Sequence, residues 1–210
     1  MSEARGELIP LADGQLRFWK GLYATPAYAG LQDTLRTTLP WRADRIRIAG
    51  QWRDIPRLQA WFGDPGCDYR YSGVTLAPHP WTPALTHLRE DLQRLAGQPF
   101  NSVLANLYRD NADSMGWHAD DEPELSRDPV IASLSFGSAR RFRLRRNDNH
   151  RQVFELELGH GDLLVMEGAL QHHWQHSIPK ERLACGERIN LTFRDLKPRT
   201  GGQQVKGAKL

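Results

Sequence analysis

Histidine and acidic residues in the second half of the chain have the types and spacing of metal ligands. His118 and Asp120 are separated by one residue, so their side chains lie on the same side of an extended segment. The segment LQHHWQHSIP offers three further imidazoles, His172, His173 and His176, and the spacing does not choose among them. Two imidazoles and one carboxylate can occupy one face of an octahedral ferrous ion, which leaves the opposite face open for dioxygen and a co-substrate. These residues therefore predict a non-haem iron site.

Two arginines further along the chain, Arg188 and Arg194, suit an anionic co-substrate of such a site. A guanidinium group pairs with a carboxylate through parallel hydrogen bonds. An iron oxygenase needs an electron source, and 2-oxoglutarate is a dianion that can supply the electrons and occupy both arginines. Metal ligands and arginines together indicate a 2-oxoglutarate-dependent oxygenase.

The composition is that of an ordinary globular domain, with 210 residues, 40% of them hydrophobic and 25% charged. No apolar run reaches the roughly 18 residues that span a bilayer, and the segment MSEARGELIP lacks the apolar core of a secretion signal. We therefore expect a cytoplasmic protein. Cys67 and Cys185 have no metal-binding spacing, and we expect both to be reduced and structural.

A net charge of +3 favours a polyanionic partner without establishing one. The charge is concentrated in the run ARRFRLRRN at 139–147. On a strand Arg141, Arg143 and Arg145 share one face while Phe142 and Leu144 point inward. This stripe, within residues 140–146, is either a phosphate-binding surface or the solvated outer face of a strand.

The elements that must position these residues differ between the two halves of the chain. The clearest helix signal covers residues 83–96, with a threonine N-cap, a first-turn proline and a terminal glycine. The first 40 residues indicate mixed or helical structure. Residues 45–78 alternate turn signals with short aromatic or β-branched segments, which predicts short strands and long loops.

From Ser102 onward the pattern changes to short β segments separated by turns. We expect strands at 103–108, 130–136, 141–144, 153–158, 162–166 and 188–194. Such a series suggests a sandwich or jelly roll, in which residues far apart in sequence meet inside one barrel mouth. The predicted fold class is mainly β with flanking helices and a double-stranded β-helix (jelly-roll) core.

Several segments of the chain carry a family resemblance. They are NLYRDNADSMGWHADDE, PVIASLSFGSARRFRLR, LELGHGDLLVMEG, HHWQHSIP and RINLTFR. Together they resemble the AlkB family of Fe(II)- and 2-oxoglutarate-dependent dioxygenases, which repair alkylated nucleobases. The resemblance covers roughly residues 45–195 and is strongest to the animal nuclear DNA-repair homologues, which share segments similar to IPRLQAWFGD and YSGVTLAPHPW.

The resemblance implies a role for each residue that matches a family motif. His118, Asp120 and His176 would hold the iron. Arg188 would pair with the distal carboxylate of 2-oxoglutarate and Arg194 would lie near its iron-side carboxylate. The remaining residues implied in co-substrate binding are Asn106, Tyr108 and Asn190. Polar residues that face inward beside apolar neighbours usually have a partner, which agrees with these roles. The alternative for Asn106 and Tyr108 is a buried polar pair, and the alternative for Asn190 is ordinary strand packing.

The resemblance also implies a pocket for a flat alkylated base. Tyr71, with Tyr69 beside it, matches the aromatic residue that stacks on the base, and a methylated ring with positive charge is attracted to a π face. Asp121 and Glu122 match an acidic pair that faces the base. Arg57 matches a residue that pairs with these acidic residues. Without the resemblance, Tyr69 and Tyr71 would be explained as a half-buried strand pair. The three charged residues would be explained as inert surface charges.

One departure from the family concerns the hairpin around Ala49. The duplex-repairing animal homologue has an aromatic finger there, which fills the gap that a flipped base leaves. Alanine cannot fill that gap, and unstacking a base costs a few kcal/mol. Ile48 or Gln51 could take over this role, so the preference for single or double strands stays open.

We predict one continuous domain. Residues 1–100 form an N-terminal helical scaffold with nucleotide-recognition hairpins and a lid, 101–196 the catalytic core, and 197–210 a flexible tail. The implied activity is oxidative demethylation of 1-methyladenine and 3-methylcytosine in DNA, with Fe(II), 2-oxoglutarate and O2, releasing succinate, CO2 and formaldehyde. We expect a monomer that binds nucleic acid and no membrane. The alternatives are the same chemistry on methylated RNA or on a protein side chain, and a nucleic-acid binder without catalysis.

Overall fold

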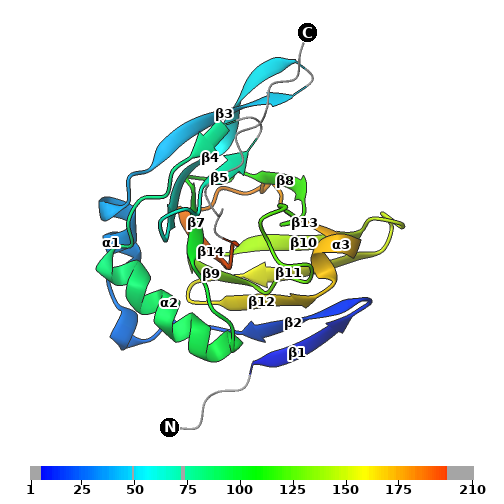
Figure 1. The fold of residues 1–210 in the computed structure, drawn as a ribbon, viewed down its shortest axis with the longest axis horizontal. Helices are drawn as coiled ribbons and strands as arrows, with labels where there is room; N and C mark the ends of the chain where they lie inside the picture. Colours follow the sequence, from blue (N-terminus) through cyan, green and yellow to red (C-terminus); the bar gives the residue numbers. More distant parts are fainter. Residues whose placement is uncertain (1–5, 49, 72–73, 198–210) are drawn as a thin grey trace.

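Two antiparallel sheets face each other, and helices cover the outer side of the larger one (Figure 1). The structure, a computed structural model, describes residues 6–48, 50–71 and 74–197, and for residues 46–48, 69–71 and 74–76 it describes the backbone alone. Ala49 and the expected tail at 198–210 therefore lie outside the described residues.

The larger sheet contains eight strands. They are β1 (Glu7–Leu11), β2 (Gly14–Trp19), β3 (Arg42–Ile48), β4 (Gln51–Gly63), β7 (Ser102–Tyr108), β9 (Ile131–Gly137), β12 (Leu163–Gly168) and β14 (Arg188–Arg194). Across the sheet the order is β1-β2-β12-β9-β14-β7-β4-β3. Strands from the first hundred residues therefore extend the sheet that the later strands build, because β2 pairs with β12 and β4 with β7.

The smaller sheet contains four strands. They are β8 (Met115–His118), β10 (Arg140–Arg146), β11 (Val153–Leu158) and β13 (Trp174–Ile178). Their order is β11-β10-β13-β8, which puts β8 at an edge. A separate two-stranded sheet is formed by β5 (Tyr69–Tyr71) and β6 (Val74–Leu76).

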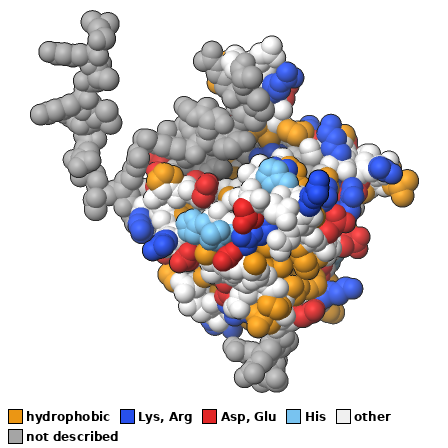
Figure 2. All heavy atoms as spheres, turned by 90° about the vertical axis from the view of Figure 1, so that its right-hand side faces the viewer, with side chains coloured by type: hydrophobic (Ala, Val, Ile, Leu, Met, Phe, Trp, Pro, Cys, Tyr) orange, Lys and Arg blue, Asp and Glu red, His pale blue; other side chains and the backbone are white. Residues whose placement is uncertain are grey.

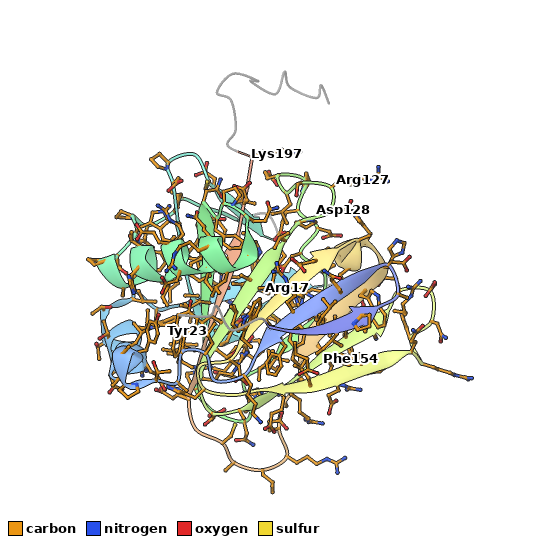
Figure 3. All side chains as sticks on the ribbon, turned by 90° about the horizontal axis from the view of Figure 1, so that it is seen from below. Arg17, Tyr23, Arg127, Asp128, Phe154 and Lys197 are labelled. Atoms are coloured by element: carbon orange, nitrogen blue, oxygen red, sulfur yellow. The ribbon has the colours of Figure 1, made fainter. Side chains whose placement is uncertain are left out.

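Four helical elements lie within the described residues, and α2 is the longest of them. They are a 3-10 turn (Pro26–Tyr28), α1 (Leu31–Thr38), α2 (Pro83–Ala96) and α3 (Leu170–His173). The helix predicted at 83–96 is confirmed, and the Thr82 side chain accepts a hydrogen bond from the backbone of Leu85 at 3.3 Å. Arg17 of β2, labelled in Figure 3, donates to the Leu95 and Ala96 carbonyls that end α2. None of the helices in the described ranges is long and apolar enough to cross a membrane.

Strand β14 shows how the larger sheet separates its two faces. All of its residues are buried, although polar and apolar side chains alternate along it. Ile189, Leu191 and Phe193 join the apolar cluster beneath α1 and α2. The alternate positions, Arg188 to Arg194, point into the layer between the two sheets. Burying a charged arginine is costly unless the guanidinium has a partner. We therefore expect the layer between the two sheets to hold the ligand-binding site.

Strand β10 confirms the predicted alternation of its basic run. Phe142 and Leu144 are buried, while Arg141, Arg143 and Arg145 are partly exposed. These arginines have partners within the protein: Glu181 for the first, Glu155 for the second and Gln175 for the third. On the face that Figure 2 shows, acidic and basic side chains are interspersed. The pairing favours a solvated outer face over a dedicated phosphate surface.

The first 40 residues are mixed, as expected, and α1 (Leu31–Thr38) ends just before Leu39 and Pro40. They begin with an antiparallel hairpin of β1 and β2, whose register pairs Leu11 with Gly14. Asp13, the second of the two turn residues, has a φ of 67°, in the left-handed region that aspartate tolerates better than most residues. The Asp13-Gly14 dipeptide is a turn signal near this position, although Gly14 itself already belongs to β2.

In the region expected to hold short strands and long loops, 45–78, the short strands β5 and β6 are confirmed, but β4 is one long strand. Strand β4 runs for 13 residues, with an exposed outer half and a buried inner half. The outer half pairs with β3 alone, whereas from Leu58 onward β4 also pairs with β7. Tertiary pairing therefore continues the strand through Pro56, which local turn signals alone could not show.

A glycine at the end of β9 is required by the backbone that faces it. Gly137 pairs with Arg188, has a φ of +90°, and a Cβ there would lie 2.3 Å from the Glu187 carbonyl oxygen. We expect Gly137→Ala to lower the free energy of unfolding by about 1–3 kcal/mol, measured by urea denaturation.

Gly159→Ala is the matched control. Gly159 is not among the positive-φ residues, and a Cβ there would come no closer than 3.6 Å to a neighbouring atom. The change in its unfolding free energy should stay within about 0.5 kcal/mol. An equal loss in both variants would contradict the backbone explanation.

Candidate metal and co-substrate site

Three candidate metal ligands meet at the edge of the smaller sheet. Strands β8 and β13 are neighbours, and His118 and His176 are direct partners in their register, with ring centroids 4.1 Å apart. Asp120 follows β8 by two residues. One ligand atom from each residue lies within 4.8 Å of the others. His172 and His173 lie on α3 with exposed side chains, so the structure places His176 in the cluster and not its two neighbours.

The cluster fits a ferrous ion. Asp120 is 2% exposed, and among the described residues its Oδ2 atom has no hydrogen-bond partner. A buried carboxylate oxygen without a partner is costly unless it binds a cation. Two imidazoles and one carboxylate form the ligand set of non-haem iron oxygenases. These residues could therefore hold Fe(II) and leave its remaining positions open.

A hydrogen bond orients the ring of His118. Its Nδ1 lies 2.9 Å from the Gly116 carbonyl oxygen, which can only accept, so Nδ1 carries the proton. The Nε2 lone pair then remains free for a metal.

Electrostatics favours the ligating protonation states of all three residues. Burial lowers the pKa of His118, and burial together with the neighbouring His118 lowers the pKa of His176 to about 3. Burial acts to raise the pKa of Asp120, but Arg194 and the two imidazoles outweigh it and hold this pKa at about 2. Neutral imidazoles beside an ionised carboxylate are the forms that bind metal ions.

A cavity between the two sheets opens beside the cluster. It is lined by Leu104, Asn106, Tyr108, Met115, His118, Asp120, Ser133, Phe142, Met166, His176, Ile178, Arg188, Asn190, Thr192 and Arg194. The smaller sheet and the loop after β8 supply the candidate ligands, and β7 and β14 supply the polar residues opposite. All of the residues predicted to bind metal or co-substrate therefore line one cavity.

Arg188 is the clearest anion-binding group in the cavity. It is 1% exposed, and its Nη2 donates to Ser135 Oγ at 2.9 Å. Within the described part of the chain, its Nε and Nη1 have no hydrogen-bond partner. Burial lowers its pKa to about 10, with a smaller contribution from Arg140, so the group stays charged near neutral pH. A carboxylate would satisfy these donors.

Arg194 lies at the other end of the same strand and contacts the ligand cluster. Its Nη2 donates to Asp120 Oδ1 at 2.5 Å. The spacing of Arg188 and Arg194 along β14 thus gives the cavity a cation beside the metal site and another further away.

The other polar residues predicted for the co-substrate are partly engaged by neighbours. Asn106 accepts a hydrogen bond from Arg57 at 2.8 Å, and Asn190 donates to Ser133 at 2.8 Å. Tyr108 lies between two buried arginines, with the guanidinium carbons of Arg140 and Arg188 at 5.4 and 5.3 Å from its ring centroid. These contacts fix the side chains that face the cavity.

The predicted substrate residues are less closely grouped. Arg57 is buried and donates hydrogen bonds to Asn106 and to the Ser114 carbonyl. We had expected it to pair with the acidic residues Asp121 and Glu122. Asp121 is exposed, whereas Glu122 is partly buried and its pKa is raised, mainly by that burial. The side chains of Tyr69 and Tyr71, as well as Ala49, lie outside the described residues.

Two residues near the site were missed by the sequence interpretation. Arg140 was counted with the basic stripe, but it faces inward and donates to the Asp110, Asp113 and Pro179 carbonyls. Its place in the alternation, on the same face as Phe142, could have shown this. Gln171 of α3 accepts a hydrogen bond from the backbone of Asp120, and no local sequence signal points to it.

Comparisons with known proteins agree with this site. The 2OG-Fe(II) oxygenase superfamily profile matches residues 15–194. The Bos taurus protein named DNA oxidative demethylase ALKBH2 is 42% identical over 163 residues, which cover 74% of this chain and 59% of the relative. The Homo sapiens alpha-ketoglutarate-dependent dioxygenase alkB homolog 3 is 46% identical over 204 residues, which cover 91% of this chain and 69% of the relative. The solved structure of OsALKBH1 aligns with a TM-score of 0.59 at 15% identity, covering 90% of this chain and 99% of that chain.

This chain belongs to the 2OG-Fe(II) oxygenase superfamily. Within it, the relatives named above are AlkB homologues, so the resemblance to that family is confirmed. The superfamily implies Fe(II), 2-oxoglutarate and O2. The predicted mainly β fold with a jelly-roll core is also confirmed, by the superfamily match and by the fold shared with OsALKBH1. The chain spans 59% of the length of the bovine ALKBH2 relative.

Proposed function

We propose that this protein is an Fe(II)- and 2-oxoglutarate-dependent oxidative demethylase that repairs N-alkylated bases such as 1-methyladenine and 3-methylcytosine in DNA. The observation that carries the proposal is the His118, Asp120 and His176 cluster, which lines one cavity with the partly unsatisfied guanidinium of Arg188. The name of the bovine relative, DNA oxidative demethylase, supports the substrate.

In this proposal the cavity residues divide the work of binding. His118, Asp120 and His176 would hold the iron, which when bound would supply activation of dioxygen coupled to decarboxylation of 2-oxoglutarate to succinate and CO2. Arg188 would bind the distal carboxylate of the co-substrate, and Arg194 would lie near its other carboxylate. The remaining co-substrate contacts are proposed for Asn106, Tyr108 and Asn190.

Recognition of the base is proposed for residues on the N-terminal side of the site and beside Asp120. Tyr69 and Tyr71 would stack on the flat alkylated base, while Glu122 and Asp121 would face it and Arg57 would support the polar wall behind it. The N-linked methyl group is oxidised to a hemiaminal, which collapses to formaldehyde and the unmodified base.

A substrate panel tests this function. The protein with Fe(II), 2-oxoglutarate and O2 would be given 1-methyladenine and 3-methylcytosine in single- and double-stranded DNA, the same lesions in RNA, and a methylated peptide. We expect formaldehyde and succinate to form in equal amounts with DNA. Preference for single strands would agree with alanine at the position of the aromatic finger.

Other outcomes would replace the proposal. Turnover of RNA or peptide alone would reassign the substrate of the same chemistry. Binding of methylated DNA without formaldehyde release, in protein that binds Fe(II) and 2-oxoglutarate, would indicate a nucleic-acid binder without catalysis. The monomeric state and the cytoplasmic location are also proposals, which gel filtration and cell fractionation would check.

A further inference from the structure

Gln171 is a buried polar residue whose amide is used at both ends. It is 3% exposed and lies on the single turn of α3. Its Oε1 accepts a hydrogen bond from the backbone N–H of Asp120 at 2.9 Å. Its Nε2 contacts Met166 Sδ, on the cavity wall, at 3.5 Å. The side chain therefore bridges a candidate metal ligand and the cavity wall.

Asp120 needs such a support more than the other two candidate ligands do. His118 and His176 lie in the neighbouring strands β8 and β13, where they are direct partners in the register. Asp120 lies beyond the end of β8, outside any strand or helix. Arg194 holds the Asp120 carboxylate, but a side-chain contact alone does not fix the position of the Asp120 backbone. The hydrogen bond to the Gln171 amide oxygen holds that backbone.

The turn that carries Gln171 is itself anchored on both sides. The backbone N–H of Ala169 donates to the Asp13 carbonyl at 2.9 Å, and the indole N–H of Trp174 donates to the Ala12 carbonyl at 2.9 Å. The β1–β2 hairpin thus braces α3 just before and just after Gln171. A glutamine on a fixed base can hold a loop in place, whereas a glutamine on a mobile turn could not.

We propose that Gln171 is a positioning residue that orients Asp120 for metal binding through its backbone. The inference rests on the proposed metal site and adds a residue to it. Partners of this kind, which touch a ligand and not the metal, set ligand geometry, and their loss typically lowers metal affinity by about 10–100-fold.

The test compares two glutamine variants of the 210-residue chain. Gln171→Met keeps the length and volume of the side chain but leaves the Asp120 N–H without its acceptor. Gln175→Met is the matched control, because Gln175 lies four positions later and bonds Arg145 on the outer face. Metal-free protein would be titrated anaerobically with Co(II), whose visible absorption reports ligand geometry. We expect the dissociation constant for Co(II) to rise by about 10–100-fold in Gln171→Met, with an altered spectrum. It should stay within about twofold in the control.

Folding and co-substrate binding separate this role from a general loss of structure. Urea denaturation should show a cooperative transition for both variants. The metal-free variants should bind 2-oxoglutarate with the same affinity as the metal-free wild type. If Gln171→Met does not fold, Gln171→Asn, which keeps the amide but shortens the reach, carries the same expectation. Wild-type Co(II) affinity and spectrum in the folded Gln171 variant, or equal losses in both glutamine variants, would overturn the inference. Absence of Co(II) binding by the wild type would instead overturn the metal site itself.

Discussion

Replacing His176 with alanine is expected to lower formaldehyde release by more than about a hundredfold, since losing even a residue that only supports a metal ligand costs about 10–100-fold. His176 is 7% exposed, faces His118 across the ladder and stacks on Phe142 with ring centroids 5.4 Å apart. Apart from His118, no other histidine in the described part of the chain belongs to the ligand cluster, so no neighbour can replace His176. Anaerobic titration with Fe(II) and 2-oxoglutarate should show the metal affinity falling in parallel with activity.

The control for this prediction is three residues away. His173→Ala removes an exposed imidazole from α3, outside the ligand cluster, and should leave turnover and metal affinity within about twofold of the wild type, as surface substitutions usually do. Retained activity in His176→Ala together with a loss in His173→Ala would show that the wrong histidine has been assigned to the metal.

Replacing Arg188 with methionine is expected to have two opposite effects. The dissociation constant for 2-oxoglutarate should rise by about 10–100-fold, because a hydrogen bond to a charged group contributes about 1.5–3 kcal/mol. The protein without ligand should become more stable, by about 1 kcal/mol or more, because an apolar side chain replaces a buried charge. That charge is costly, since Arg188 is 1% exposed and two of its nitrogens have no partner among the described residues.

Thermal melting with and without 2-oxoglutarate measures both effects in one experiment. The wild type should melt at a lower temperature than Arg188→Met without ligand, and only the wild type should gain substantially from added 2-oxoglutarate. Arg143→Met, on the outer face of β10 with Glu155 as partner, is the matched control and should change neither quantity by more than about 0.5 kcal/mol. Wild-type affinity for 2-oxoglutarate in Arg188→Met would remove this arginine from the co-substrate site.

Local sequence patterns predicted those elements whose structure depends mainly on residues adjacent in the sequence. The boundaries of α2 follow from its caps, and β14 follows from strict alternation between Arg188 and Arg194. The same alternation placed Phe142 and Leu144 inside and the arginines between them outside. The spacing of His118 and Asp120 likewise predicted that both reach one point.

What the sequence could not decide depends on pairing between distant segments. Spacing left three histidines as candidates for the third ligand, and only the register of β13 with β8 brings His176 against His118. The bond from Gln171 to Asp120 spans 51 positions and needs α3 to sit under the β1–β2 hairpin. Arg57 was expected beside the acidic pair, but β4 places it next to Asn106. Such contacts are properties of sheet order, which no local pattern contains.

The position of each strand within its sheet gives the two walls of the cavity unequal local stability. Strand β14, with Arg188 and Arg194, is hydrogen-bonded on both sides, by β9 and β7, in the middle of the larger sheet. Strand β8, with His118, is a four-residue edge strand whose register with β13 is irregular. Edge strands open at a lower free energy than central ones. We therefore expect the co-substrate wall to open at a higher free energy than the ligand wall. A metal ion shared by β8 and β13 would cross-link the ligand wall and oppose its fraying.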